Sequence, residues 1–108
     1  MEKRKALIID KETDFCLLMG HYLSRKDIDT YYTDTIDEGL EIIECKRPDI
    51  IIADKNLPTL ENSLRFIIDA INDYDPNVFL IDSKSPGKDG SRMDLIDEII
   101  KWIKDKFW

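Results

Sequence analysis

The sequence has few cysteines, few glycines and no long apolar run, and each of these features excludes a class of protein. It contains two cysteines, Cys16 and Cys45, which are too few for a disulfide framework or a zinc site. Its four glycines are not clustered, so it lacks a glycine-rich phosphate loop and is not expected to bind nucleotides through one. No apolar run approaches the roughly 18 residues that span a bilayer, and the amino-terminal segment does not resemble a signal peptide. We therefore expect a soluble, cytoplasmic protein.

Positive charge is also scarce. The chain has 16 Lys and Arg residues against 23 Asp and Glu residues, which gives a formal net charge of −7. Contacts with nucleic-acid phosphates or anionic membranes require clustered basic residues, so this balance argues against both as partners. We expect the chain to act through contacts with other proteins.

What the sequence does contain is an alternation of two hydrophobic periods. Short apolar or β-branched runs predict strands, and apolar residues at helical spacing predict helices between them. The predicted strands cover 5–10, 28–33, 49–54 and 77–81, and the predicted helices cover 12–26, 35–47, about 60–71 and about 95–107. A loop is expected over about 83–92.

Two of the helices carry more detailed signals. Thr35 and Glu38 have the spacing of a capping box, which predicts that the second helix begins there. The inner face of the first helix is predicted to consist of Phe15, Leu18, Met19, Tyr22 and Leu23. The inner face of the last helix is predicted to consist of Leu95, Ile96, Ile99, Ile100, Ile103 and Phe107.

This order of elements predicts a single α/β domain over residues 1–108. Parallel strands need long, right-handed crossovers, which place helices on both faces of one sheet. The result is a three-layer, doubly wound, flavodoxin-like fold in which the first and third strands are neighbours. Asp10 and Asp54 end those two strands, so we expect both carboxylates at the carboxyl edge of the sheet, where such folds place functional residues.

Three fragments, 7–10, 48–54 and 56–58, resemble the receiver domain of two-component response regulators in their order and spacing. The resemblance covers about residues 4–82. It implies that Asp54 accepts a phosphoryl group from a histidine kinase or a phosphotransfer protein. It also implies that Mg²⁺ is bound by Asp10, Asp54 and the backbone carbonyl of Asn56. These hard oxygen ligands suit Mg²⁺, which offsets the repulsion between a carboxylate and an anionic phosphoryl group.

The sequence departs from the receiver pattern directly after Asp10. Receivers commonly have a second acid at the next position, but here it is Lys11, followed by Glu12. Two geometries are compatible with this change. The Lys11 ammonium pairs with Asp54 and replaces part of the metal charge, or it points outward and leaves Glu12 to supply the second carboxylate.

The carboxyl-terminal half departs further from the family. Receivers usually end the fourth strand with Thr or Ser, whereas Asp82 stands there and Ser83 follows, so Ser83 takes this role only through a shift of one residue. The segment before the last helix is too short for a complete fourth helix and fifth strand, so we expect four main strands with those elements missing or reduced. Lys84 or Lys88 is then the candidate for the phosphoryl-contacting lysine of the family.

Two functions follow from this resemblance. The first is a receiver module, not an enzyme, that is phosphorylated on Asp54 with Mg²⁺ and changes its contact with a downstream protein. The alternative is a pseudo-receiver that binds partners or dimerises without phosphorylation. Phe107 and Trp108 at the end of the chain suggest a homodimer or partner contact, because large apolar side chains there need something to pack against.

Overall fold

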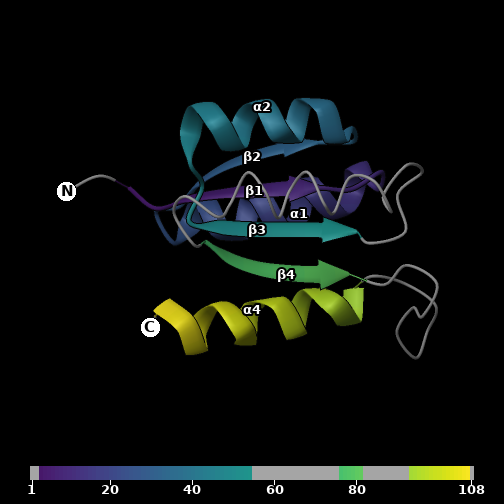
Figure 1. Cartoon of the computed structure of the whole chain (residues 1–108). Helices are drawn as coiled ribbons and strands as arrows, with labels where there is room; N and C mark the ends of the chain where they lie inside the picture. The colour runs from purple at the N-terminus through teal and green to yellow at the C-terminus, as the bar shows by residue number, and fades with distance from the viewer. Residues whose placement is uncertain (1–2, 55–75, 82–92, 108) are drawn as a thin grey trace.

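The structure is a computed structural model that describes residues 3–54, 76–81 and 93–107. Its strands are β1 (Lys5–Ile9), β2 (Asp29–Thr33), β3 (Ile50–Asp54) and β4 (Asn77–Ile81). They form a parallel sheet with the order β2-β1-β3-β4 (Figure 1). The helices are α1 (Thr13–Arg25), α2 (Ile36–Lys46) and α4 (Met93–Phe107). The predicted four strands and the doubly wound α/β fold are confirmed.

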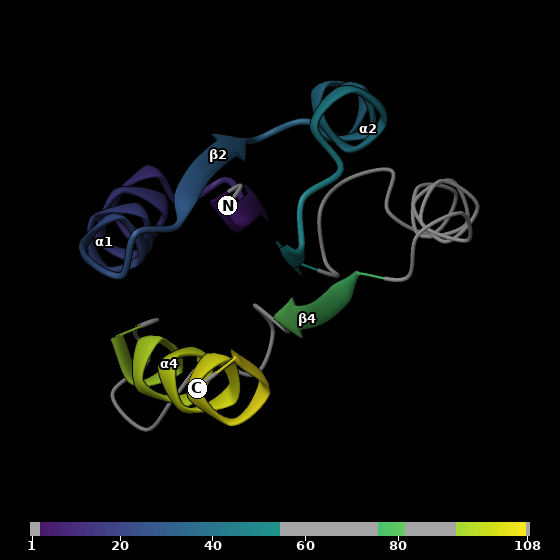
Figure 2. The same cartoon turned by 90° about the vertical axis from the view of Figure 1, so that its left-hand side faces the viewer.

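Helices cover the sheet on both faces, with α1 and α4 on one side and α2 on the other (Figure 2). Strand β1 lies between β2 and β3 and alternates between the two cores. Ala6 and Ile8 pack with the α1 and α4 side chains, while Leu7 and Ile9 pack with α2. All four side chains are fully buried. Burial of a large aliphatic side chain contributes about 1.5–3 kcal/mol, so this strand anchors both layers.

Helix α1 follows the predicted range closely, but its predicted inner face was partly wrong. Phe15, Met19 and Leu23 are buried as expected, whereas Leu18 is 45% exposed. Cys16 is buried in its place and packs in the α1 and α4 core. Four-residue steps from Phe15 set the buried stripe, and Leu18 lies on its margin.

Helix α2 begins at the predicted cap. The Thr35 hydroxyl accepts a hydrogen bond from the Glu38 amide at 3.3 Å. The second half of the capping box does not form, because the Thr35 amide donates to the Thr33 hydroxyl at 3.2 Å. That hydroxyl in turn donates to the Glu38 carboxylate at 2.6 Å. Gly39 then faces β1 closely, since a Cβ at this position would lie 2.7 Å from Ile9 Cδ1.

Helix α4 packs on the same face as α1. Ile99 and Ile103 are fully buried, and Trp102 contacts Phe79 of β4 edge to face with ring centroids 5.3 Å apart. These contacts confirm the centre of the predicted inner face. The side chain of Phe107 and all of Trp108 lie outside the described residues, so the homodimer contact suggested there stays a prediction.

The predicted third helix and the loop over 83–92 also lie outside the described residues. Among the helices that the structure does describe, none is both long and apolar enough to cross a bilayer. The cytoplasmic location stays a prediction.

Candidate functional site

The candidate site lies where β1 and β3 end. Ile9 pairs with Ala53 in the parallel ladder between these strands. Asp10 follows Ile9, and Asp54 follows Ala53 as the last residue of β3. Because neighbouring strands lie about 4.8 Å apart, the backbone at positions 10 and 54 is side by side. The structure therefore brings the two predicted acids to the same edge of the sheet.

Asp10 is held in place from two directions. Its backbone amide donates a hydrogen bond to the Thr33 carbonyl at 3.0 Å, which ties the end of β1 to the end of β2. Its Oδ1 atom accepts a hydrogen bond from the Glu12 amide at 2.8 Å, just before α1 begins. The positive end of the α1 dipole favours a carboxylate at this position. The Asp10 side chain is thus oriented at the end of β1.

The burial of Asp10 is unusual for a carboxylate. Only 2% of the residue is exposed, and it is one of two buried polar or charged residues in the described part of the chain. Charged groups are rarely buried unless hydrogen bonds or a cation compensate the lost hydration. A buried, oriented carboxylate at a strand end is a suitable donor for a hard cation such as Mg²⁺.

Lys11 and Glu12 are both exposed. Lys11 forms no ion pair with any side chain that the structure describes. Glu12 is the residue before the first turn of α1, and its carbonyl accepts a hydrogen bond from the Cys16 amide at 3.1 Å. Its side chain does not cap the helix.

The other predicted site residues lie outside the described part of the chain. They are the side chain of Asp54 together with Asn56, Asp82, Ser83, Lys84 and Lys88. Within residues 3–54, 76–81 and 93–107, the described side chains form no cluster of three or more potential metal ligands. Asp10 is therefore the member of the predicted Mg²⁺ site whose contacts are defined, and the rest of the ligand set stays a prediction.

Thr33 supports the site but was not singled out in the sequence. It is 6% exposed at the end of β2, its carbonyl accepts from Asp10, and its hydroxyl donates to Glu38. Its position in the sequence could have indicated this role, because Thr33 ends the strand next to β1, and Asp10 directly follows β1. Thr33 links the site to the first turn of α2.

Comparison of the structure with solved structures identifies the fold. The chain is similar to a response regulator receiver domain protein (CheY-like) from Methanospirillum hungatei, with a TM-score of 0.75 and 18% identity over 97% of this chain and 94% of that one. It is also similar to the receiver domain of the hybrid histidine kinase CckA, with a TM-score of 0.66 and 14% identity over 96% and 99% of the two chains.

A third similar structure is the signal receiver domain of a LuxO repressor protein from Vibrio parahaemolyticus. It gives a TM-score of 0.65 and 22% identity over 93% of this chain and 72% of that one. No family model matches the sequence, and no curated protein does so either. The chain has the receiver-domain fold, and the resemblance noted in the sequence is confirmed at the level of the fold.

Proposed function

We propose that this chain is a receiver module of a two-component phosphorelay that is phosphorylated on Asp54. The observation that supports the proposal is the buried, oriented Asp10 carboxylate, which ends the strand next to the one that Asp54 ends. In this proposal, the donor is a histidine kinase or a phosphotransfer protein, and phosphorylation changes a contact with a downstream protein.

The transfer requires two carboxylates with different tasks. An Asp54 carboxylate oxygen attacks the phosphorus atom, the bond between phosphorus and the donor breaks, and the donor atom leaves with the electron pair. Asp10 is held by the Glu12 amide and does not react, which suits a ligand. Bound Mg²⁺ would supply the positive charge that offsets repulsion between the carboxylates and the phosphoryl oxygens.

The remaining groups have supporting tasks in this proposal. The Asn56 carbonyl completes the Mg²⁺ ligands from the chain, and Ser83 and Lys84 bind the phosphoryl oxygens. We take Lys11 as directed to solvent, in line with its exposure, so that Glu12 is the available second carboxylate.

Intact-mass spectrometry after incubation with acetyl phosphate and Mg²⁺ tests this proposal. We expect one phosphoryl adduct that depends on Mg²⁺ and is lost in Asp54→Ala. Asp49→Asn is the matched control, because Asp49 directly precedes the same strand at its opposite end and Asn retains an acceptor oxygen for the Lys5 amide. This variant should be labelled like the unchanged protein.

Failure would take one of two forms. Labelling that survives in Asp54→Ala would exclude Asp54 as the acceptor. No labelling, under conditions that label a known receiver domain, would favour the pseudo-receiver, which keeps the fold and acts by binding alone.

A further inference from the structure

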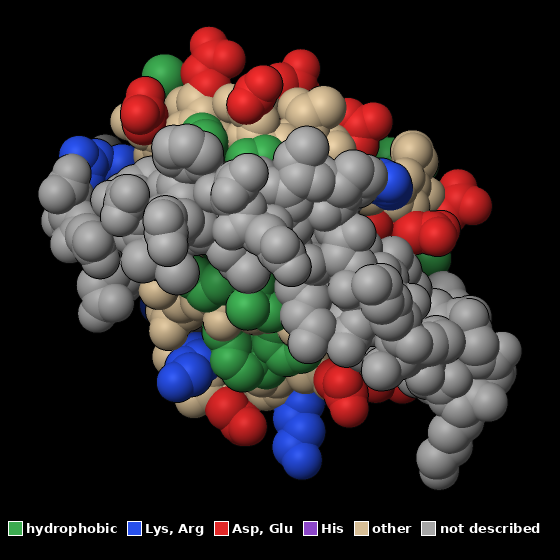
Figure 3. All heavy atoms as spheres, turned by 45° about the vertical axis from the view of Figure 1, so that its right-hand side comes forward, with side chains coloured by type: hydrophobic (Ala, Val, Ile, Leu, Met, Phe, Trp, Pro, Cys, Tyr) green, Lys and Arg blue, Asp and Glu red, His purple; other side chains and the backbone are tan. Residues whose placement is uncertain are grey.

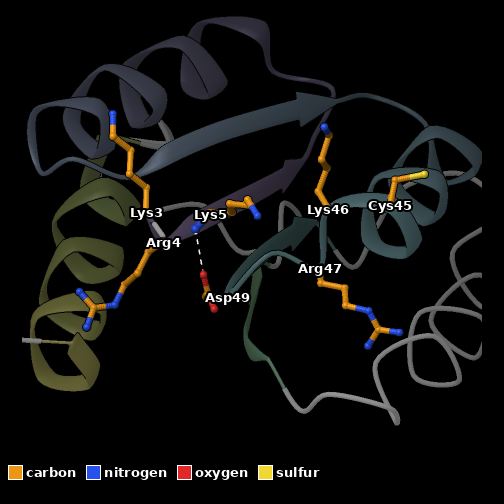
Figure 4. Close-up of a pocket in the computed structure, with 7 residues that line it drawn as sticks. All are labelled: Lys3, Arg4, Lys5, Cys45, Lys46, Arg47 and Asp49. Atoms are coloured by element: carbon orange, nitrogen blue, oxygen red, sulfur yellow. Dashed lines mark hydrogen bonds between the residues drawn. The ribbon is translucent and has the colours of Figure 1, made fainter. Parts of the chain in front are cut away.

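A pocket of about 380 Å³ lies at the opposite, amino edge of the sheet. Its lining is strongly basic although the whole chain carries a net charge of −7. The charged residues that line it are Lys3, Arg4, Lys5, Lys46, Arg47 and Asp49. Figure 4 shows Lys5 and Asp49 at the centre, with the other four charged side chains spread around them.

The topology brings two distant basic segments together here. Residues 3–5 lead into β1 and include its first residue. Lys46 ends α2 and Arg47 follows it, shortly before β3, which is the parallel neighbour of β1. Two hydrogen bonds fix the junction. The Asp49 amide donates to the Lys5 carbonyl at 2.8 Å, and the Lys5 amide donates to Asp49 Oδ2 at 2.9 Å. The floor of the pocket is therefore built from the sheet itself.

The charges of Lys5 and Lys46 remain available to a ligand. The acid of the pocket, Asp49, is engaged by a backbone amide. Lys46 lies over the Tyr31 ring at 6.0 Å from its centroid, a contact that retains its full charge. The Lys5 ammonium forms no ion pair with any side chain in the described ranges. Lys3 is paired, through Asp27 at 3.2 Å.

Arg47 lines the pocket directly after α2. It has a φ of 48°, in the left-handed region that favours glycine. Arginine binds phosphate oxygens through two parallel N–H groups, which makes it a common residue in phosphate sites.

We propose that this pocket binds a small anion that carries two or more phosphate groups. Its volume lies within the range of about 300–1,000 Å³ that is typical of small-molecule sites. Lys3 and Arg4 come from one side of Asp49, and Lys46 and Arg47 from the other (Figure 4). A ligand with two charged groups contacts both sides and keeps each group away from the Asp49 carboxylate. The site lies at the edge opposite Asp54 and does not depend on phosphorylation.

Titration with inorganic pyrophosphate, followed by the backbone amide signals of ¹⁵N-labelled protein, tests the proposal. We expect saturable shifts confined to residues 3–5 and 46–49. Arg47→Gly and Lys5→Gln should each weaken binding about tenfold, the effect of losing one charge-assisted hydrogen bond. Arg47→Gly also relieves the left-handed backbone, so this variant is expected to stay folded.

Lys101→Gln is the matched control, because Lys101 is exposed on α4 and does not line the pocket. It should bind like the unchanged protein, and so should Asp54→Ala. Titration with adenosine diphosphate distinguishes a nucleotide ligand from an inorganic one, since either would carry the proposed phosphates.

Three results would overturn the proposal. The first is the absence of saturable shifts with both probes. The second is equal weakening in Lys101→Gln and Arg47→Gly, which would indicate general attraction of anions to the surface. The third is binding of an acidic peptide but of neither probe, which would assign the pocket to a protein partner.

Discussion

The two edges of the sheet carry opposite charge. At the carboxyl edge, acids end the strands, with Asp10 after β1 and Asp54 at the end of β3. At the amino edge, basic residues precede the same two strands, at positions 3–5 and 46–47. Because all strands run parallel, the residue types before and after each strand gather at separate edges. One short sequence thereby forms an acidic site and a basic pocket on one scaffold.

The helices reinforce this separation. In a doubly wound fold each helix begins near the carboxyl edge and ends near the amino edge, so its dipole favours acids at the first edge and bases at the second. Helix α2 shows the pattern, with Asp37 and Glu38 in its first turn and Lys46 in its last. Acidic side chains gather over the top of the molecule in Figure 3, where α2 lies.

Among the variants that test the difference between the two edges, Asp10→Asn is expected to have the largest effect. Asparagine keeps an acceptor for the Glu12 amide but loses the charge, so the fold should persist while Mg²⁺ binding fails. We expect labelling by acetyl phosphate to decrease about a hundredfold or more in intact-mass time courses. Asp49→Asn, the same change at the other edge, should leave labelling intact. Equal labelling of the two variants would remove Asp10 from the proposed metal site.

Lys11→Asp should sharpen the acidic character of the carboxyl edge. It replaces a cation with an anion next to Asp10, and we expect about tenfold tighter Mg²⁺ binding by isothermal titration, with a smaller gain at high salt. Lys101→Asp makes the same charge change on α4 and should have little effect. Unchanged affinity in Lys11→Asp would place position 11 too far from the metal to matter.

At the amino edge, Arg47→Gly should increase the stability of the fold while it weakens ligand binding. Glycine adopts the left-handed conformation without steric cost, so we expect the free energy of unfolding to increase by about 0.5–1 kcal/mol in urea titrations. This gain would accompany the loss of pyrophosphate binding described above. A decrease in stability would mean that the contacts of the Arg47 side chain contribute more to the fold than its left-handed backbone costs.

The smallest effect is expected from Asp27→Asn. The Asp27 carboxylate, through a hydrogen bond first and its charge second, raises the pKa of Lys3 above its ordinary value of 10.5. A base with a raised pKa contributes stability below pH 10.5 that is lost as the pH rises through the raised value. Both side chains are largely exposed, at 54% and 78%, so we expect a decrease of about one degree in the thermal midpoint at pH 7. The difference should disappear at pH values above the raised pKa.

The sequence predicted the fold well because its signals are local. Each strand is a short apolar or β-branched run, and Thr35 marks the beginning of α2 within one residue of its observed start. The adjacency of β1 and β3 also followed from the fold class, so the shared edge of Asp10 and Asp54 was predicted correctly. Leu18 was misplaced because a helix turns about 100° per residue and its margin is hard to locate from spacing alone.

The basic pocket was not predicted, because net charge averages over the whole chain. Its two basic segments are about forty residues apart in the sequence, and neither is long enough to indicate a site. The positions of the two segments relative to the predicted strands could nevertheless have indicated the pocket. Each segment lies at or just before the beginning of a predicted strand, and the predicted neighbours β1 and β3 begin at the same edge.

Strand β1 is buried on both faces, and this affects how its register with the neighbouring strands is specified. In a strand with one polar face, a slip of one residue would expose apolar side chains and bury polar ones. The free-energy cost of that exchange disfavours the slipped register. Residues 6–9 of β1 are apolar on both faces, so this safeguard is absent. The alignment of β1 with β3 is instead supported at the amino end, where the Lys5 amide donates to the Asp49 side chain at 2.9 Å, because a slip of one residue would break this bond. Asp49, which lines the basic pocket, therefore also helps to keep β1 and β3 in register.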